Sequence, residues 1–146
     1  MTTGIYAGSF NPFTTGHASI VARALTLFDR VVIAIGVNIS KDSGGAEQRR
    51  DHIAALYAEE PRVEVVVWDG LAVELARRYD SRWLIRGVRS AAEFEAERNM
   101  ADTNRAIGGI DTLLLPAVPE LGFVSSSMVR ELERFGADTS PFLPKP

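Results

Sequence analysis

The chain has 146 residues, a formal net charge of −3 and no cysteine. This length suits one ordinary domain with a sizeable core, and the lack of cysteine excludes disulfides, thiolate metal sites and a cysteine nucleophile. A slightly acidic chain is not expected to bind nucleic acid in bulk. The sequence shows neither a long apolar segment nor a basic-then-apolar leader, so we expect no membrane association and a cytoplasmic location.

Short apolar runs alternate with helical patterns along the chain. In chain order the pattern predicts strand 4–7, helix 17–28, strand 31–37, helix 46–59, strand 63–68, helix 71–79, strand 83–86, helix 91–107, strand 112–116 and helix 126–135. Strands that are apolar on both faces and alternate with helices are typical of parallel sheets with right-handed crossovers. We therefore expect an α/β fold, a single Rossmann-like domain over residues 1–146 with a five-stranded parallel sheet and helices on both faces.

The segment GSFNPFTTGH, residues 8–17, joins the first expected strand to the first expected helix. Glycine lets a backbone approach a ligand closely, and the free N–H groups at a helix start bind anions. His17 in the first helical turn can add a donor aimed at the same anion. Each part alone could be a turn or a helix cap, but the combination after a first strand predicts a nucleotide-phosphate site.

Three further segments follow expected strands, where ligands of open α/β sheets bind. Lys41 ends VNISK and is either a solvated loop residue or a cation for a phosphate. Arg86 and Arg89 flank a glycine, and they could pair with Glu93, Glu95 or Glu97 or clamp a phosphate with their guanidinium forks. The serines of 125–127 precede a helix, either as caps or as a second anion site.

The Thr-x-Gly-His part of the first segment resembles the signature of the nucleotidyltransferase superfamily. From residue 4 to about residue 143 the chain resembles the phosphopantetheine adenylyltransferase family, on GSFNPFTTGH, VNISK, WDGLAVELA, LIRGVRSAAEFEAERNMADTNR, GFVSSSMVREL and DTSPFLP. That resemblance implies adenylyl transfer from ATP to 4′-phosphopantetheine, giving dephospho-coenzyme A and pyrophosphate in coenzyme A biosynthesis. It also implies Mg²⁺ bound with ATP and no metal ligand from the protein.

The same resemblance assigns roles to individual residues. Catalytic roles fall to His17, Lys41 and Arg89. The acceptor contacts are Ser9, Lys41, Ala72 and Arg86. The ATP contacts are Ser9, Phe10, His17, Gly87, Val88, Arg89, Glu97, Leu121, Gly122, Phe123, Val124, Ser125, Ser126 and Ser127. It further implies a homohexamer, for which the helix at 91–107 is a candidate contact surface.

Other functions remain open at this point. The acceptor could be nicotinate mononucleotide or a sugar phosphate, although the RGVR and EFEAE motifs favour phosphopantetheine. The chain could instead be a catalytically silent nucleotide-binding module, against which His17, Lys41, Arg86 and Arg89 argue. A flavodoxin-like binding domain would need neither this histidine nor the two arginines.

Overall fold

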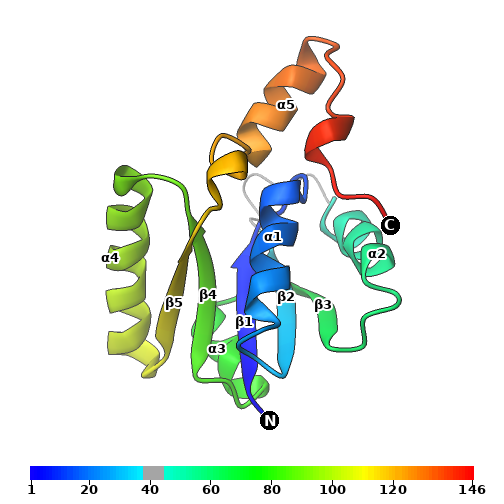
Figure 1. Ribbon diagram of the computed structural model, residues 1–146. Helices are drawn as coiled ribbons and strands as arrows, with labels where there is room; N and C mark the ends of the chain where they lie inside the picture. Colours follow the sequence, from blue (N-terminus) through cyan, green and yellow to red (C-terminus); the bar gives the residue numbers. More distant parts are fainter. Residues whose placement is uncertain (38–44) are drawn as a thin grey trace.

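The computed structural model describes residues 1–37 and 45–146. Five parallel strands form one sheet in the order β3-β2-β1-β4-β5 (Figure 1). The elements are β1 Thr3–Gly8, α1 Thr15–Ala24, β2 Arg30–Gly36, α2 Ala46–Leu56, β3 Val63–Trp68, α3 Ala72–Arg78, β4 Trp83–Val88, α4 Ala91–Gly108, β5 Asp111–Pro116, the 3-10 turn η1 Pro119–Leu121, α5 Ser126–Arg134 and the 3-10 turn η2 Ser140–Phe142.

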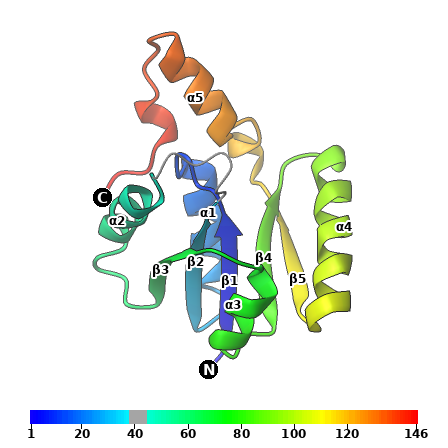
Figure 2. The same cartoon turned by 180° about the vertical axis from the view of Figure 1, so that it is seen from behind.

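Helices cover both faces of the sheet, as the sequence predicts. On one face, residues of α1 and α2 such as Val21 and Ile53 pack against Ile33 and Ile35 of β2. On the other face, α3 packs on a second cluster that includes Val32 and Ala34 of the same strand. Because side chains alternate along a strand, a run that is apolar at every position is buried on both faces. Figures 1 and 2 show α1 and α3 on opposite sides of the sheet.

Side-chain caps set the starts of three helices. Thr14 caps α1, Ser90 caps α4 by accepting from the Glu93 N–H at 3.1 Å, and Ser125 caps α5 by accepting from the Met128 N–H at 3.1 Å. Each cap satisfies one of the N–H groups that a helix start leaves unpaired. These caps explain why the helices begin close to their expected first residues.

Element ends differ from the expectation at several positions. Helices α1 and α2 end at Ala24 and Leu56, earlier than the expected residues 28 and 59. Strand β4 is longer than expected and continues through Gly87 and Val88, which pair with Leu115 and Pro116 of β5. Glycine is disfavoured in strands, so this extension comes from pairing with the neighbouring strand and not from local preference.

Helix α5 and the turn η2 lie beyond the carboxyl edge of the sheet (Figures 1 and 2). Phe123, just before α5, meets the ring of Phe142 in η2 edge-on at 5.8 Å. The proline-rich C-terminal segment contains one 3-10 turn. Within residues 1–37 and 45–146, no helix is both long and apolar enough to cross a membrane.

The contact between α4 and α3 leads to a stability prediction. A Cβ atom added at Gly108 would lie 2.7 Å from Cβ and 2.8 Å from Cγ1 of Val73. Valine cannot move these atoms without moving its backbone, so we expect Gly108→Ala to lower the free energy of unfolding by about 1–3 kcal/mol. Gly36→Ala is the control, because its Cβ would meet only the Gly8 carbonyl at 3.8 Å. Urea denaturation compares the two variants, and equal midpoints would contradict the prediction.

Candidate functional site

The site begins where β1 and β4 separate. These strands pair from Gly4 and Trp83 to Tyr6 and Ile85, and no further. The sheet order also reverses here, since β2 and β3 extend on one side of β1 and β4 and β5 on the other. In open α/β sheets a ligand crevice lies at the carboxyl ends of the strands at this switch point.

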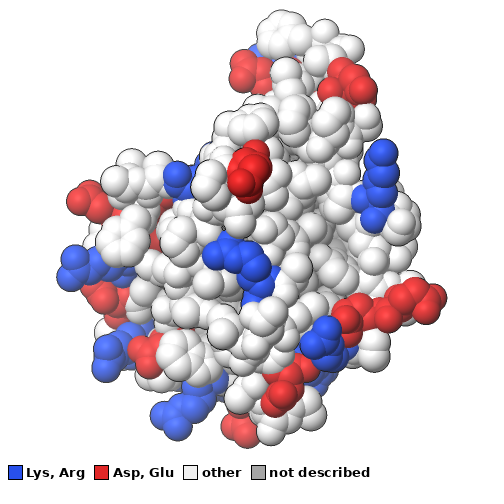
Figure 3. All heavy atoms as spheres, viewed as in Figure 1, with Lys and Arg blue, Asp and Glu red and all other residues white. Residues whose placement is uncertain are grey.

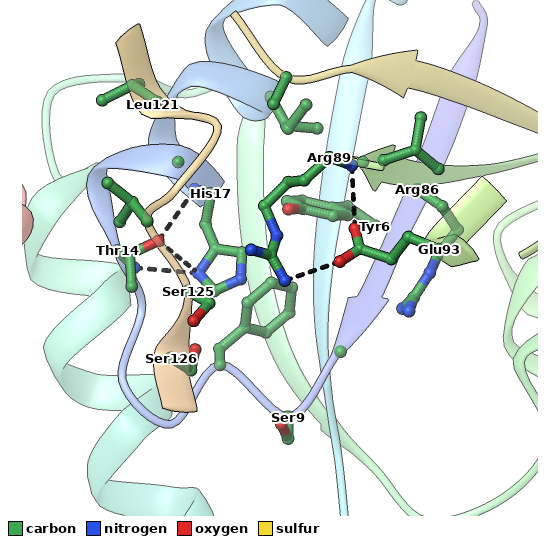
Figure 4. Close-up of a pocket in the computed structure, with 18 of the residues that line it drawn as sticks. Tyr6, Ser9, Thr14, His17, Arg86, Arg89, Glu93, Leu121, Ser125 and Ser126 are labelled. Atoms are coloured by element: carbon green, nitrogen blue, oxygen red, sulfur yellow. Dashed lines mark hydrogen bonds and ion pairs between the residues drawn. The ribbon is translucent and has the colours of Figure 1, made fainter. Parts of the chain in front are cut away.

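A cavity of about 430 Å³ occupies this crevice. Its walls come from the β1–α1 loop, α1, the end of β4, α4 and the start of α5 (Figure 4). The residues that line it are Tyr6, Ala7, Gly8, Ser9, Phe10, Thr14, Gly16, His17, Ile20, Arg86, Gly87, Val88, Arg89, Glu93, Glu97, Ala117, Leu121, Val124, Ser125, Ser126, Ser127 and Arg130. The volume suits a small-molecule ligand of nucleotide size.

His17 is held by the cap of its own helix. The Thr14 hydroxyl accepts from the His17 backbone N–H at 3.3 Å, and the Thr14 backbone N–H donates to His17 Nδ1 at 2.9 Å. This reciprocal arrangement is a capping box in which histidine replaces the usual Glu or Gln. Because Nδ1 accepts a hydrogen bond, the proton of the neutral ring lies on Nε2. The fold therefore presents His17 as an Nε2–H donor.

The surroundings of His17 keep the ring neutral. Burial, reinforced by the positive charges of Arg86 and Arg89, lowers its pKa to about 4. The rings of Phe10 and Phe13 lie 5.0 and 5.4 Å from it. At neutral pH the imidazole is thus uncharged, and it can stabilise a developing anion by hydrogen bonding without acting as a general acid.

Phe10 has an unusual backbone. Its φ is +47°, in the left-handed region that aromatic residues rarely adopt. Only 3% of its surface is exposed, and its ring packs edge-on against Tyr6 at 5.0 Å. Tertiary packing therefore holds the strained loop in one shape around His17.

Two arginines at the end of β4 are paired with carboxylates of α4. Arg86 donates from Nε and Nη2 to the two oxygens of Glu97, at 2.8 and 2.7 Å. Arg89 Nη2 lies 2.6 Å from Glu93 Oε2, and the Arg89 backbone N–H donates to Oε1 at 3.0 Å. The sequence allowed these arginines either to pair with glutamates or to clamp a phosphate. The two roles are compatible, because both arginines are paired and still line the cavity (Figure 4).

The start of α5 closes the cavity opposite β4. Ser126 Oγ donates to the Pro12 carbonyl at 2.7 Å, and Arg130 Nη1 donates to the Asn11 carbonyl at 2.6 Å. Both bonds tie α5 to the β1–α1 loop, more than 110 positions away in the sequence. The serines thus bring a second helix N-terminus to the cavity that the first one already borders.

A second cavity of about 380 Å³ lies between α3, α4 and the sheet. It is lined by Ala7, Gly70, Leu71, Ala72, Leu84, Ile85, Arg86, Ala96, Glu97, Met100, Ala101, Asn104 and Thr112. Most of these side chains are apolar. Three residues, Ala7, Arg86 and Glu97, line both cavities, so the two spaces adjoin at the end of β1.

The structure brings most of the expected site residues together. Of the expected nucleotide contacts, all line the first cavity except Gly122 and Phe123, which lie in the turn before α5. Ala72 lines the second cavity and Arg86 lines both. Lys41 lies outside the described residues.

Sequence reasoning missed several lining residues. Arg130 could have been found from its spacing, since it follows Ser126 by four residues and therefore shares a helix face with it. Asn104 follows the expected site residue Glu97 by seven residues, two helical turns, and so lies on the same helix face. Tyr6 and Ile20 give no such signal, because an apolar core residue and an apolar site residue look alike in a sequence.

The fold, the Thr-x-Gly-His helix start and the cavity at the switch point together define the nucleotidyltransferase class. In agreement, a model of the cytidylyltransferase-like family matches residues 5–132.

Curated relatives identify the family within this class. Phosphopantetheine adenylyltransferase of Porphyromonas gingivalis is 50% identical over 97% of this chain and 93% of its own length. The enzymes of the same name from Phocaeicola vulgatus and Leuconostoc citreum are 46% and 38% identical over 99% of this chain, and over 97% and 93% of their own lengths. The chain belongs to the phosphopantetheine adenylyltransferase family.

The environment of His17 predicts how its protonation affects stability. In the unfolded chain the pKa is near 6.5, and in the folded protein it is about 4. Between these values the unfolded chain binds a proton that the folded protein does not, so lowering the pH from 6.5 to 4 favours unfolding. We expect this single group to reduce the free energy of unfolding by about 3 kcal/mol over that interval, with no further change above pH 6.5.

NMR titration of the imidazole nitrogens checks both parts of this prediction. It should show the Nε2–H form at pH 7 and a midpoint near 4. Denaturation at several pH values should show a flatter pH dependence for His17→Gln, which keeps the cap acceptor and removes the titration. An Nδ1–H form, or a midpoint near 6.5, would refute the assignment.

Proposed function

We propose that this protein transfers the adenylyl group of ATP to 4′-phosphopantetheine, producing dephospho-coenzyme A and pyrophosphate. One observation carries this proposal, namely that two cavities meet at Arg86. The first has two helix starts and suits a nucleotide triphosphate. The second is lined mostly by apolar side chains and has Arg86 at its boundary, which suits a long flexible arm that ends in a phosphate. Arg86 at the junction would hold that phosphate beside the nucleotide.

The reaction needs no protein nucleophile. The acceptor phosphate is an anion that can attack the α-phosphorus of ATP, and pyrophosphate then leaves. The protein contributes orientation and charge stabilisation. His17 Nε2–H, Arg89 and the N–H groups at the start of α5 would stabilise charge on the α-phosphate and the leaving group. Arg86, with Lys41, would hold the attacking phosphate against its repulsion from the triphosphate.

We further propose that Mg²⁺ enters with ATP. In the described ranges, no three His, Asp or Glu side chains are grouped so that they could hold a metal ion. Oxygens of the triphosphate and of water would therefore be its ligands, as is usual for magnesium bound with nucleotides. The metal would neutralise phosphate charge, and the chain's own donors would orient the phosphates.

Product analysis tests the proposed reaction. With ATP, Mg²⁺ and 4′-phosphopantetheine, we expect release of pyrophosphate and formation of dephospho-coenzyme A, and the reverse reaction from the two products. Nicotinate mononucleotide run in parallel should give at most slow turnover. Faster turnover with that acceptor would refute the acceptor assignment, and tight ATP binding without turnover of any acceptor would indicate a silent nucleotide-binding module.

His17→Gln tests the role of the histidine. Glutamine can accept the Thr14 N–H in the capping box but lacks the ring N–H at the position of Nε2. Loss of one preorganised donor to a developing charge lowers kcat by about 10²–10³-fold. We expect this loss with little change in KM for ATP. Near-normal kcat with a raised KM would instead mean that His17 contributes uniform binding.

We also propose that the protein assembles through α4, as a hexamer with dihedral symmetry. This 18-residue helix contains no buried residue. Met100 and Ile107 are 57% and 50% exposed, and they lie two turns apart on one face. Exposed apolar residues in such a row favour contact with another subunit.

Light scattering at micromolar concentration tests the assembly. The unaltered chain should have six times the monomer mass, and Ile107→Glu should reduce it because a charge would be buried in the contact. A monomeric unaltered chain would refute the assembly and leave the chemistry unaffected.

Other partners and the location of the protein remain expectations. Acidic and basic side chains are interspersed on the face drawn in Figure 3, which supports the expectation that nucleic acid is not a partner. A cytoplasmic enzyme without membrane association is still our prediction from the sequence.

A further inference from the structure

The boundary between the two cavities consists of one hydrogen-bonded group. The residues common to both linings are Ala7, Arg86 and Glu97. Arg86 Nη1 donates to the Ala7 carbonyl, and Nε and Nη2 donate to Glu97. Since β1 and β4 stop pairing at Tyr6 and Ile85, this side-chain network spans the strands just beyond their last paired residues. The network therefore lies on the wall that the two cavities share.

Both partners in the pair have limited capacity for other ligands. Glu97 uses each of its two oxygens for Arg86, and its side chain is only 14% exposed. Arg86 uses three of its N–H groups, and a guanidinium has five. The two that remain are one on Nη1 and one on Nη2. Two such donors on neighbouring nitrogens match two oxygens of one phosphate.

We infer that Glu97 is a positioning residue that acts through Arg86: it fixes the guanidinium at the boundary of the two cavities, with two N–H groups left for the acceptor phosphate. The family resemblance instead assigns Glu97 to ATP. A carboxylate is repelled by a triphosphate, and both oxygens of Glu97 already accept hydrogen bonds from Arg86. This inference rests on the proposed function, because it concerns the phosphate of the acceptor.

Helix α4 provides a matched control. Glu93 lies four residues before Glu97 on the same face. It pairs with Arg89 through one guanidinium nitrogen and the Arg89 backbone N–H. Glu93→Gln and Glu97→Gln each remove one charge and weaken one ion pair of α4 with the end of β4. A loss that reflects only the stability of this helix would therefore appear in both variants.

The experiment is steady-state kinetics of the full chain, with ATP and 4′-phosphopantetheine varied separately. Loss of a two-point charged pair predicts that Glu97→Gln lowers kcat/KM for the acceptor by about 10- to 100-fold. KM for ATP should stay within about twofold. Glu97→Asp should recover part of the loss because it keeps the charge. Glu93→Gln acts next to Arg89, so any loss that it causes should fall on kcat or on KM for ATP and not on KM for the acceptor.

A second measurement does not depend on the substrate. In NMR spectra of the ligand-free protein, the Arg86 Nε–H signal should be protected from exchange with water and should lose this protection in Glu97→Ala, which has no acceptor, but not in Glu93→Ala. If protection persists in Glu97→Ala, the positioning role is refuted whatever the acceptor is. A rise in KM for ATP with unchanged acceptor kinetics would also refute it and would make Glu97 a nucleotide ligand.

The proposed function can fail separately from this inference. If the unaltered chain uses another acceptor and not phosphopantetheine, the proposed function is refuted. Persistent Arg86 Nε–H protection in Glu97→Ala would still refute the positioning role in that case. If Glu93→Gln and Glu97→Gln lower activity and melting temperature by equal amounts, both carboxylates only stabilise the fold, and the positioning role of Glu97 is refuted.

Discussion

The separation of β1 from β4 is the constraint on which the site depends. Their pairing ends at Tyr6 and Ile85, while β1 continues to pair with β2 and β4 with β5. The chain segments that follow β1 and β4 therefore diverge. The space between these segments is lined by the carboxyl ends of the two strands. The helix start after β1 and the arginines at the end of β4 face one another only because these strands are neighbours in the sheet.

The same side chains that stabilise the fold locally also set the chemistry. His17 Nδ1 completes the cap of α1, and this bond places the remaining proton on Nε2. The arginines whose charges help to lower the pKa of His17 are themselves held by Glu93 and Glu97. The first cavity thus contains positive charge that is already paired, and this pairing limits both the cost of burying the arginines and their freedom to move.

Much of the fold and part of the site follow from local sequence patterns. Apolar runs identified all five strands, and the serines of 125–127 marked the start of α5. The Thr-x-Gly-His segment and the serines before α5 indicated anion sites because helix starts have this property wherever they occur. The extension of β4 through Val88 was missed, because strand pairing decided it.

The sequence by itself determined the order of elements, the residues buried on both faces of the sheet, and the chemical types available at the strand ends. These depend on periodicity and on interactions within one or two helical turns. Only the tertiary structure decided that Arg86 pairs with Glu97 and Arg89 with Glu93 when Glu95 was equally available, and that Arg130 reaches the Asn11 carbonyl. It also decided that two cavities adjoin at Arg86. The physical reason is that such contacts depend on how the order of strands in the sheet places segments that are far apart in the chain. Local sequence patterns do not specify these distances and directions.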